Sequence, residues 1–272
     1  MDILELDVLK GYVRLCNDGW EQGWHERNGG NLTYRMTRDE VSQCRPFFSE
    51  KGTWTSLGVA LPNLAGEYFL TTGTGKFFRN VILAPEQNIG IAEIDKAGES
   101  YRIVWGLNCC ADLPTSEFPS HLMNHSVKKK QGNYRVIYHA HPQNVIALSF
   151  LLPLDAKTFT RALWTTMTEC PIVFPRGVGV LPWMMPGGVE IARATSALME
   201  DYDAAVWAHH GIFCAGETFD LTFGLMHTIE KSAQIRMLLL QSGQPILQTI
   251  TDEQLLAIEK DFRISLNHAF LN

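Results

Sequence analysis

Apolar and polar residues follow two spacings along this chain, and the change from one to the other marks the predicted helices and strands. Apolar residues recur every three or four positions in several segments, which is typical of helices with one buried face. We therefore predict helices over residues 2–24, 115–129, 144–152, 156–166, 186–201, 218–241 and 251–262. Runs rich in β-branched and aromatic residues predict strands at 32–36, 67–70, 89–94, 101–105, 134–142, 171–174, 177–181 and 204–214.

The order of these elements predicts a mixed α/β fold. The strands at 89–94 and 101–105 are separated by a polar loop that contains Gly98, which predicts an antiparallel hairpin. Residues 37–64 show no clear period, so we interpret them as irregular. The chain has no internal repeat, low-complexity tract or clear linker, and we expect a single domain over residues 1–272.

Composition excludes one class of function. The 272 residues are 46% hydrophobic and 19% charged, with a net charge of −6, so a sizeable core is available and the chain is acidic. Nucleic-acid affinity depends on clustered Lys and Arg, and the one basic run, residues 128–130, ends a predicted helix. We expect no nucleic-acid partner.

Cysteine spacing and the length of the apolar stretches indicate in which cellular compartment the protein is expected. The six cysteines have no Cys-x-x-Cys spacing, and no charged-then-apolar leader precedes them; they are Cys16, Cys44, Cys109, Cys110, Cys170 and Cys214. We therefore expect a reduced, cytoplasmic protein. The longest apolar stretch, residues 145–154, is interrupted by Ser149 and Pro153 and is far below the roughly 18 residues that span a bilayer. No membrane role is expected.

The strand at 134–142 ends in two histidines, His139 and His141. Residues two apart on a strand share a face, so both imidazoles point into the same space, and Pro142 ends the strand just beyond them. Two imidazoles at a rigid strand end form half of a divalent-metal site, and zinc needs one or two further ligands. A pair of hydrogen-bonded core histidines is the alternative.

Other histidines could complete or compete with this site. The strand at 204–214 carries His209 and His210, which face opposite sides of a regular strand, so only one can join the metal and spacing does not choose between them. His121 and His125 have the spacing of helical zinc ligands, but the glutamate of the zincin pattern is absent. A cupin site is disfavoured as well, because no glutamate follows His141 at a short spacing.

Two glycine-rich loops are candidates for binding a phosphate. Residues 27–31 combine glycines with side-chain amides, and residues 71–76 combine glycines with threonine hydroxyls. Backbone N–H groups in such loops can hold an anion, although either loop can also be a plain turn. The Walker spacing is absent from the second loop, which disfavours an ATPase. Thr115 or Ser116 can cap the next helix, and Glu117 lies at its start, where a carboxylate often only complements the helix dipole.

Taken together, these motifs resemble the class II aldolase and ribulose-phosphate 4-epimerase family. The resemblance rests on five motifs in the same order over nearly the whole chain, at residues 28–31, 72–75, 115–117, 139–141 and 210–211. Within the family, residues 26–33, 75–80, 168–170 and 173–175 are most similar to members that act on L-rhamnulose 1-phosphate. The chain departs from the expected pattern in Thr74, where serine is usual, and in Ala140 and His209.

The resemblance implies a three-layer α/β/α sandwich around a largely antiparallel central sheet. It implies zinc-dependent, reversible cleavage of L-rhamnulose 1-phosphate to dihydroxyacetone phosphate and L-lactaldehyde, with one Zn²⁺ per subunit bound by His139, His141 and His210. The phosphate would be surrounded by Asn28, Gly30, Asn31, Thr74, Gly75, Thr115 and Ser116.

Two carboxylates receive catalytic roles from the same resemblance. Glu117 would shuttle the proton at the carbon that forms the new bond, and Glu169 would assist at the aldehyde oxygen, from a neighbouring subunit of a homotetramer. Lewis-acid chemistry at a zinc held by neutral imidazoles suits the charge that such a cleavage develops. Three alternatives remain: another sugar-phosphate aldolase, a 4-epimerase of the family, and a non-catalytic metal-dependent sugar-phosphate binder, which would have no need of Glu117.

Overall fold

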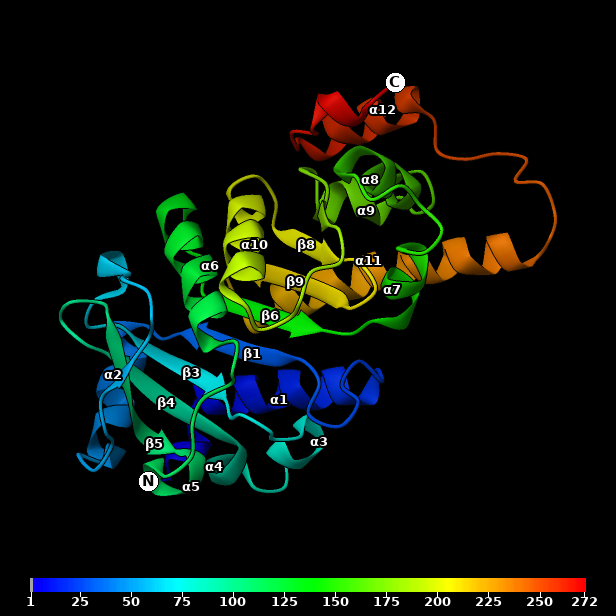
Figure 1. Cartoon of the computed structure of the whole chain (residues 1–272). Coiled ribbons are helices and arrows are strands. Elements are labelled where there is room, and N and C mark those ends of the chain that lie inside the picture. The colour runs from blue at the N-terminus through cyan, green and yellow to red at the C-terminus, as the bar shows by residue number, and fades with distance from the viewer. Residues whose placement is uncertain (1) are drawn as a thin grey trace.

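One mixed sheet runs through the molecule (Figure 1). The computed structural model describes residues 2–272, except for the side chain of Cys109. Within that range the sheet has nine strands in the order β2-β5-β4-β3-β1-β6-β9-β8-β7. They are β1 (Asn31–Arg35), β2 (Thr55–Ser56), β3 (Tyr68–Thr72), β4 (Ile89–Ile94), β5 (Ser100–Gly106), β6 (Val136–Ala140), β7 (Gly179–Leu181), β8 (Ala204–Trp207) and β9 (Gly211–Gly216). Neighbouring strands are antiparallel except β7 and β8, which confirms the predicted fold class.

Helices cover both faces of this sheet. Successive strand residues point to opposite sides, so the strands bury apolar side chains on each face. In β6, Val136 and Tyr138 join the large core beneath α1 (Asp7–Glu21) and α11 (Phe219–Gln241). Ile137 lies in a smaller core with residues of α10 (Val189–Asp201). A third core joins the first turns of α6 (Phe118–Gln131) to β3, β4 and β5. The helices α6 and α10 pack together over one face, and α1 and α11 pack together over the other.

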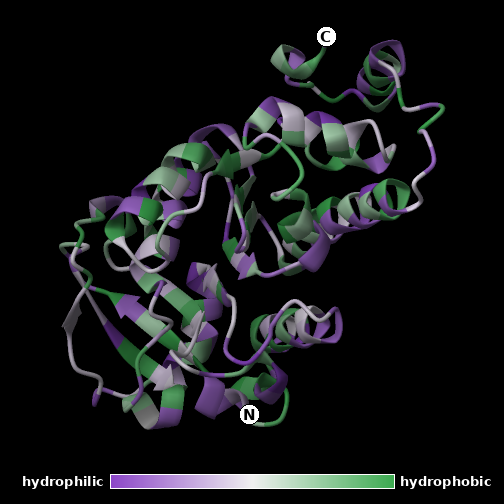
Figure 2. Cartoon of the chain, turned by 45° about the vertical axis from the view of Figure 1, so that its right-hand side comes forward, coloured by the Kyte–Doolittle hydropathy of each residue, from purple (hydrophilic) through white to green (hydrophobic). Residues whose placement is uncertain are grey.

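Shorter helices complete these layers. They are α2 (Arg38–Cys44), α3 (Phe78–Val81), α4 (Pro85–Asn88), α5 (Leu107–Cys110), α7 (Gln143–Leu148), α8 (Ala156–Trp164), α9 (Glu169–Val173) and α12 (Asp252–Phe262), with 3-10 turns η1 (Ile3–Glu5), η2 (Arg45–Phe47), η3 (Pro62–Leu64) and η4 (His268–Phe270). Figure 2 shows both hydrophobic and hydrophilic bands on the helices around the sheet, as amphipathic covering helices require. In residues 2–272, no helix is long and apolar enough to cross a membrane.

Several sequence predictions are confirmed. The hairpin of β4 and β5 is antiparallel, and α12 begins with the capping box of Thr251 and Gln254. The long helix α11 begins after Thr218 and is followed by Gly243 in the left-handed region, at φ 67°.

Three predictions are wrong. Residues 171–174 belong mostly to the short helix α9, not to a strand, because that segment packs against α8, α11 and α12. The excursion 37–64 is not wholly irregular, since Thr37 and Glu40 form a capping box that starts α2. The predicted strand 204–214 is two antiparallel strands, β8 and β9, joined by a turn that contains His209 and His210.

Candidate metal centre and active site

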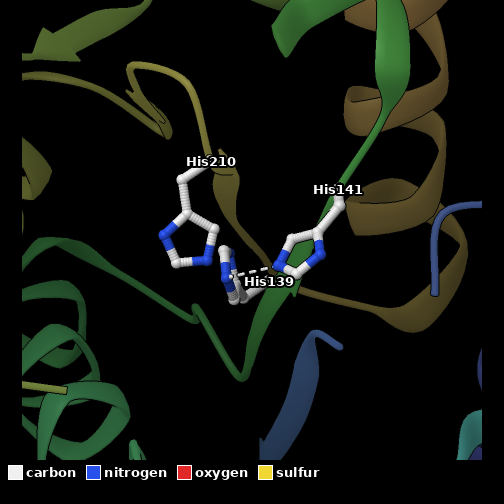
Figure 3. A group of neighbouring side chains, drawn as sticks. All are labelled: His139, His141 and His210. Atoms are coloured by element: carbon white, nitrogen blue, oxygen red, sulfur yellow. Dashed lines mark hydrogen bonds between the residues drawn. The ribbon is translucent and has the colours of Figure 1, made fainter. Parts of the chain in front are cut away.

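Three histidines converge where β6 meets the turn between β8 and β9 (Figure 3). His139 is in β6, His141 follows its last residue, and His210 precedes β9. One ring nitrogen from each can be chosen so that all lie within 4.8 Å of one another. The ring centroids are 4.9 to 5.1 Å apart. The His-x-His spacing therefore brings its two imidazoles together as predicted, and the turn supplies the third.

The turn geometry decides between His209 and His210, which spacing left open. His209 has a left-handed backbone, at φ 63°, so the two side chains do not alternate as they would on a strand. The His209 ring packs on Phe150 with centroids 4.1 Å apart, and its backbone N–H donates to Ser149 Oγ at 2.8 Å. The His210 ring instead faces His139 and His141. His210 is the third member of the cluster.

Protein groups orient two of the three rings. His139 donates from Nδ1 to the backbone oxygen of Ile212 at 3.1 Å, and His141 Nδ1 lies 2.7 Å from Glu26 Oε1. These contacts leave both Nε2 atoms directed at each other, 3.3 Å apart. A metal-binding histidine is commonly held in this way, with one nitrogen on an oxygen acceptor and the other on the ion.

The protonation state of the cluster suits a cation. Burial lowers the pKa of His139 well below its usual value, and the neighbouring histidines lower it further. Burial also lowers the pKa of His210 to about 4, with His141 adding to the effect. Both imidazoles are therefore neutral at pH 7, and neutral nitrogen is the form that binds zinc. The three residues fit a divalent metal with open coordination positions.

Glycines beside the cluster keep space for these rings. A Cβ at Gly211 would lie 2.9 Å from His141 Cδ2 and 2.4 Å from the backbone oxygen of Ala140. A Cβ at Gly29 would lie 3.0 Å from His141 Cε1. The first glycine-rich loop and the β8–β9 turn therefore both approach the metal site at backbone distance.

Glu117 lies beside this cluster through a chain of specific contacts. Asn31 in β1 is the cross-strand partner of His139 in β6, so their side chains lie on one face of the sheet. Asn31 donates from Nδ2 to Glu117 Oε2 at 2.8 Å. Glu117 is itself the N-cap of α6, in place of the predicted Thr115 or Ser116, because the helical backbone begins only at Phe118.

The surroundings of Glu117 favour proton exchange. The residue is 8% exposed, and burial raises the pKa of its carboxyl, whereas the hydrogen bond from Asn31 and the nearby His141 oppose that rise. A carboxyl whose protonated form is favoured by burial is suited to taking up and returning a proton.

The predicted phosphate residues lie on three segments that are joined by direct contacts. Gly73 forms a β-bridge with Pro114, and Thr115 N–H donates to the Thr72 backbone oxygen at 2.7 Å. These bonds hold residues 73–75 against residues 114–116. His25 joins the third segment, because its ring stacks on Phe78 at 3.6 Å and its Nδ1 donates to the Gly29 oxygen at 2.9 Å.

The exposure of these residues divides them into a floor and a rim. Asn31 and Thr115 are buried, and Gly30 is partly buried. The remaining members are exposed; they are Asn28, Thr74, Gly75 and Ser116. Such a rim of amide, hydroxyl and backbone groups is open to an anion from solvent.

The sequence interpretation missed two residues that hold the site together. Glu26 orients His141, and His25 ties the loop of residues 27–31 to Phe78 and to Tyr138, whose hydroxyl is 2.6 Å from His25 Nε2. Both precede a glycine-rich loop that was singled out, but their partners are more than 50 residues away along the chain. Only the fold shows these roles.

Two other candidates lie outside the cluster. His121 and His125 both contact Thr33 Oγ1, at 2.8 and 2.9 Å, which makes them hydrogen-bonded core residues and not a rival metal pair. Glu169 begins α9 and is exposed, and it does not join the histidine cluster in the part of the chain that is described. Its role at the aldehyde stays a prediction.

The chain is similar to known proteins in sequence and in fold. The chain matches the family described as Class II Aldolase and Adducin N-terminal domain over residues 11–237. It is 43% identical to the rhamnulose-1-phosphate aldolase of Klebsiella pneumoniae subsp. pneumoniae, over 96% of this chain and 95% of that protein. It is 44% identical to the rhamnulose-1-phosphate aldolase of Salmonella choleraesuis, over 94% of each. A solved sugar-phosphate aldolase from Thermotoga maritima matches with a TM-score of 0.72 and 27% identity, over 86% of this chain and 95% of that one.

Proposed function

The chain belongs to the class II aldolase and adducin N-terminal domain family, and from that premise we propose that it cleaves L-rhamnulose 1-phosphate reversibly into dihydroxyacetone phosphate and L-lactaldehyde. It is an aldehyde-lyase that serves rhamnose catabolism. The observation that carries the proposal is the position of the buried Glu117 carboxyl next to a cluster of three histidines. Relatives named for this activity are about as long as this chain and match nearly all of it, which supports the choice of substrate.

The metal in this proposal is one Zn²⁺ per chain. His139, His141 and His210 would hold it through the ring nitrogens that face one another. Three imidazoles and an open position are the ligand set of catalytic zinc. When bound, the ion supplies Lewis-acid stabilisation for the oxygens of the ketose.

Glu117 moves the proton in the proposed reaction. Cleavage of the carbon–carbon bond converts the hydroxyl on the departing carbon into the aldehyde carbonyl, which releases one proton. It leaves negative charge on the dihydroxyacetone phosphate carbon, which must take up one proton. Glu117 is buried and its pKa is raised, so its carboxyl can hold that proton and release it in the reverse direction. Asn31 keeps one carboxyl oxygen in place through its 2.8 Å bond.

The phosphate group of the substrate would lie on the exposed rim. The backbone N–H groups of Gly75 and Ser116 and the hydroxyls of Thr74 and Ser116 offer donors without any cluster of Lys or Arg, whereas the N–H groups of Gly73 and Thr74 already donate to backbone oxygens of Asn88 and Leu113. Asn31 can contribute as well, because its amide nitrogen has a second hydrogen beyond the one given to Glu117.

Glu169 and the assembly belong to the same proposal. The exposed position of Glu169 at the start of α9 supports a role across a subunit boundary, at the aldehyde half of a neighbouring site in a homotetramer. Mixing unfolded Glu117→Gln and Glu169→Ala subunits and refolding them together tests this. Activity should reappear in the mixture if the two carboxylates come from different subunits, and it should stay absent if both act within one chain.

A coupled assay tests the reaction. The metal-loaded protein is given L-rhamnulose 1-phosphate, and released dihydroxyacetone phosphate is followed through its reduction by NADH. Formation of a stereoisomeric sugar phosphate without free dihydroxyacetone phosphate would identify a 4-epimerase instead. Metal-dependent binding of the sugar phosphate without any turnover would identify a non-catalytic binder.

A further inference from the structure

A line of buried polar side chains continues inward from Asn31, away from the metal cluster. Asn31 Oδ1 is hydrogen bonded to His121 Nε2. His121 Nδ1 lies 2.8 Å from Thr33 Oγ1, and the same hydroxyl lies 2.9 Å from His125 Nε2. Thr33, His121 and His125 have no exposed surface. None of these three has a role in the function proposed above.

The hydrogen bonds along this line run in one direction. Burial lowers the pKa of His121 to about 3 and that of His125 well below its usual value, so each neutral ring has one N–H. The direction follows from the inner end of the line. His125 Nδ1 has no hydrogen-bond partner among the described residues, so it is the unprotonated nitrogen, because a buried N–H without an acceptor is rarer than a free lone pair, and His125 Nε2 donates to Thr33 Oγ1. The Thr33 hydroxyl then donates to His121 Nδ1, and His121 Nε2 donates to Asn31.

This direction fixes the orientation of the Asn31 amide. A flipped amide would direct its NH2 group at the His121 N–H and its oxygen at the Glu117 carboxylate. Both contacts would then pair like with like, donor against donor and acceptor against acceptor. The observed orientation pairs each group with its complement, and Glu117 receives a donor at 2.8 Å.

We propose that His121, held by Thr33 and His125, is a positioning residue that locks the Asn31 amide with its NH2 group toward Glu117. The proposal rests on the function above, in which Glu117 exchanges a proton with dihydroxyacetone phosphate. A locked amide holds one carboxyl oxygen of Glu117 and leaves the other for the substrate carbon. Loss of the lock allows the amide to rotate and the carboxyl to leave its productive position.

Thr33 offers a matched pair of variants, because it touches neither the proposed metal ligands nor the rim. Thr33→Val keeps the shape and removes the hydroxyl that connects the two histidines, whereas Thr33→Ser keeps the hydroxyl. The readout is exchange of the dihydroxyacetone phosphate proton in deuterated water, with no aldehyde present, in protein whose zinc content is measured. Thr33→Val should slow exchange about tenfold at unchanged zinc content, as expected for a lost hydrogen bond to a buried group. Thr33→Ser should stay within about twofold of the parent.

A second measurement does not depend on activity. Nitrogen-15 spectra of the histidine rings distinguish the two neutral tautomers, and His121 and His125 should both carry their proton on Nε2 in the parent protein. In Thr33→Val the His121 signal should lose this fixed tautomer. A proton on Nδ1 of His121 in the parent would overturn the proposal, and so would exchange in Thr33→Val at the parent rate or an equal loss in Thr33→Ser.

The proton transfer by Glu117 and the positioning role of His121 can be refuted separately. Absence of exchange in the parent protein would refute the proton transfer assigned to Glu117, and with it the catalytic consequence of the lock. The spectra would still test the hydrogen-bond direction on which the positioning role is built. Exchange in the parent together with unchanged exchange in Thr33→Val would refute the positioning role alone.

Discussion

Two sets of three histidines, an outer and an inner group, differ in what their ring nitrogens contact. In the outer group (His139, His141 and His210) the rings face one another, and His139 and His141 each keep Nε2 free of any oxygen acceptor. In the inner group (His25, His121 and His125) the rings have no exposed surface, and His25 and His121 use both nitrogens in hydrogen bonds to the protein. The inner group is defined by burial and is not one cluster, because His25 bonds Tyr138 on the α1 side of the sheet, whereas His121 and His125 lie on α6.

This comparison shows that burial alone does not separate a metal ligand from a structural histidine. His139 is as deeply buried as the inner group, at 1% exposed, and burial lowers its pKa as it does theirs. The difference is that each outer histidine can direct one ring nitrogen toward ring nitrogens of the other two, whereas the inner histidines direct theirs at protein oxygens or at none.

The largest effect is expected from loss of an outer histidine. His210→Ala removes one of three ligands, so zinc should be lost and turnover should fall about 10³- to 10⁴-fold, since Lewis-acid stabilisation is worth several kcal/mol. His209→Asn is the control, because asparagine tolerates the left-handed backbone and the residue faces Phe150. Elemental analysis measures the zinc content and the coupled assay measures turnover. Zinc loss in His209→Asn and not in His210→Ala would identify His209 as the ligand.

Glu117→Gln should abolish proton transfer without affecting metal binding. The substitution keeps the size of the side chain and removes its proton-accepting function, so turnover should fall about 10³-fold, within the usual range for a positioned acid or base. Zinc content should not change, because Glu117 is not among the clustered ligand atoms. Retained turnover would assign the proton transfer to another group.

A smaller effect is expected at the acceptor of an outer histidine. Glu26 bonds His141 Nδ1 at 2.7 Å, but its side chain is 67% exposed, so Glu26→Ala should weaken zinc affinity by about tenfold, the low end for such partners. Glu26→Gln keeps an oxygen acceptor and should recover part of the loss. Competition with a coloured chelator measures the zinc affinity of the parent and of both variants. Equal affinity in all three proteins would show that Glu26 does not support zinc binding.

The inner histidines should make the free energy of unfolding depend on pH. Burial lowers the pKa of His25 and His121 to about 3, so the folded protein does not bind these protons when the unfolded chain does, below about pH 6.5. This part of the unfolding free energy is complete above pH 6.5 and is lost as pH falls, approaching about 1.4 kcal/mol per pH unit for each histidine. Urea unfolding of the metal-free protein between pH 7 and 5 measures the slope. His121→Gln should have a shallower slope, and a flat profile in the parent would contradict the prediction.

The sequence was most informative where local chemistry decides local structure. The alternation of side chains on a strand was sufficient to bring His139 and His141 together, and the capping box of Thr251 and Gln254 marked the start of α12. The order of several motifs indicated the family, which the match over residues 11–237 confirms. These signals depend on neighbours in the chain.

The sequence failed where distant contacts decide. The turn at His209 contains no glycine, asparagine or proline to mark it, so β8 and β9 were interpreted as one strand. The apolar run before Phe174 is too short for periodicity to distinguish a helix from a strand, and packing against α11 and α12 selects the helix. The roles of Glu26 and His25 likewise depend on partners that only the folded chain brings near.

The pairing of β1 with β6 has a consequence for protein engineering. Because Asn31 stands opposite His139, the register of these two strands sets where the amide that holds Glu117 lies relative to the histidine cluster. A shift of one residue in this pairing would turn Asn31 to the other face of the sheet. Redesign for new aldehydes should therefore keep the residues that pair β1 with β6 and vary exposed segments outside the phosphate rim.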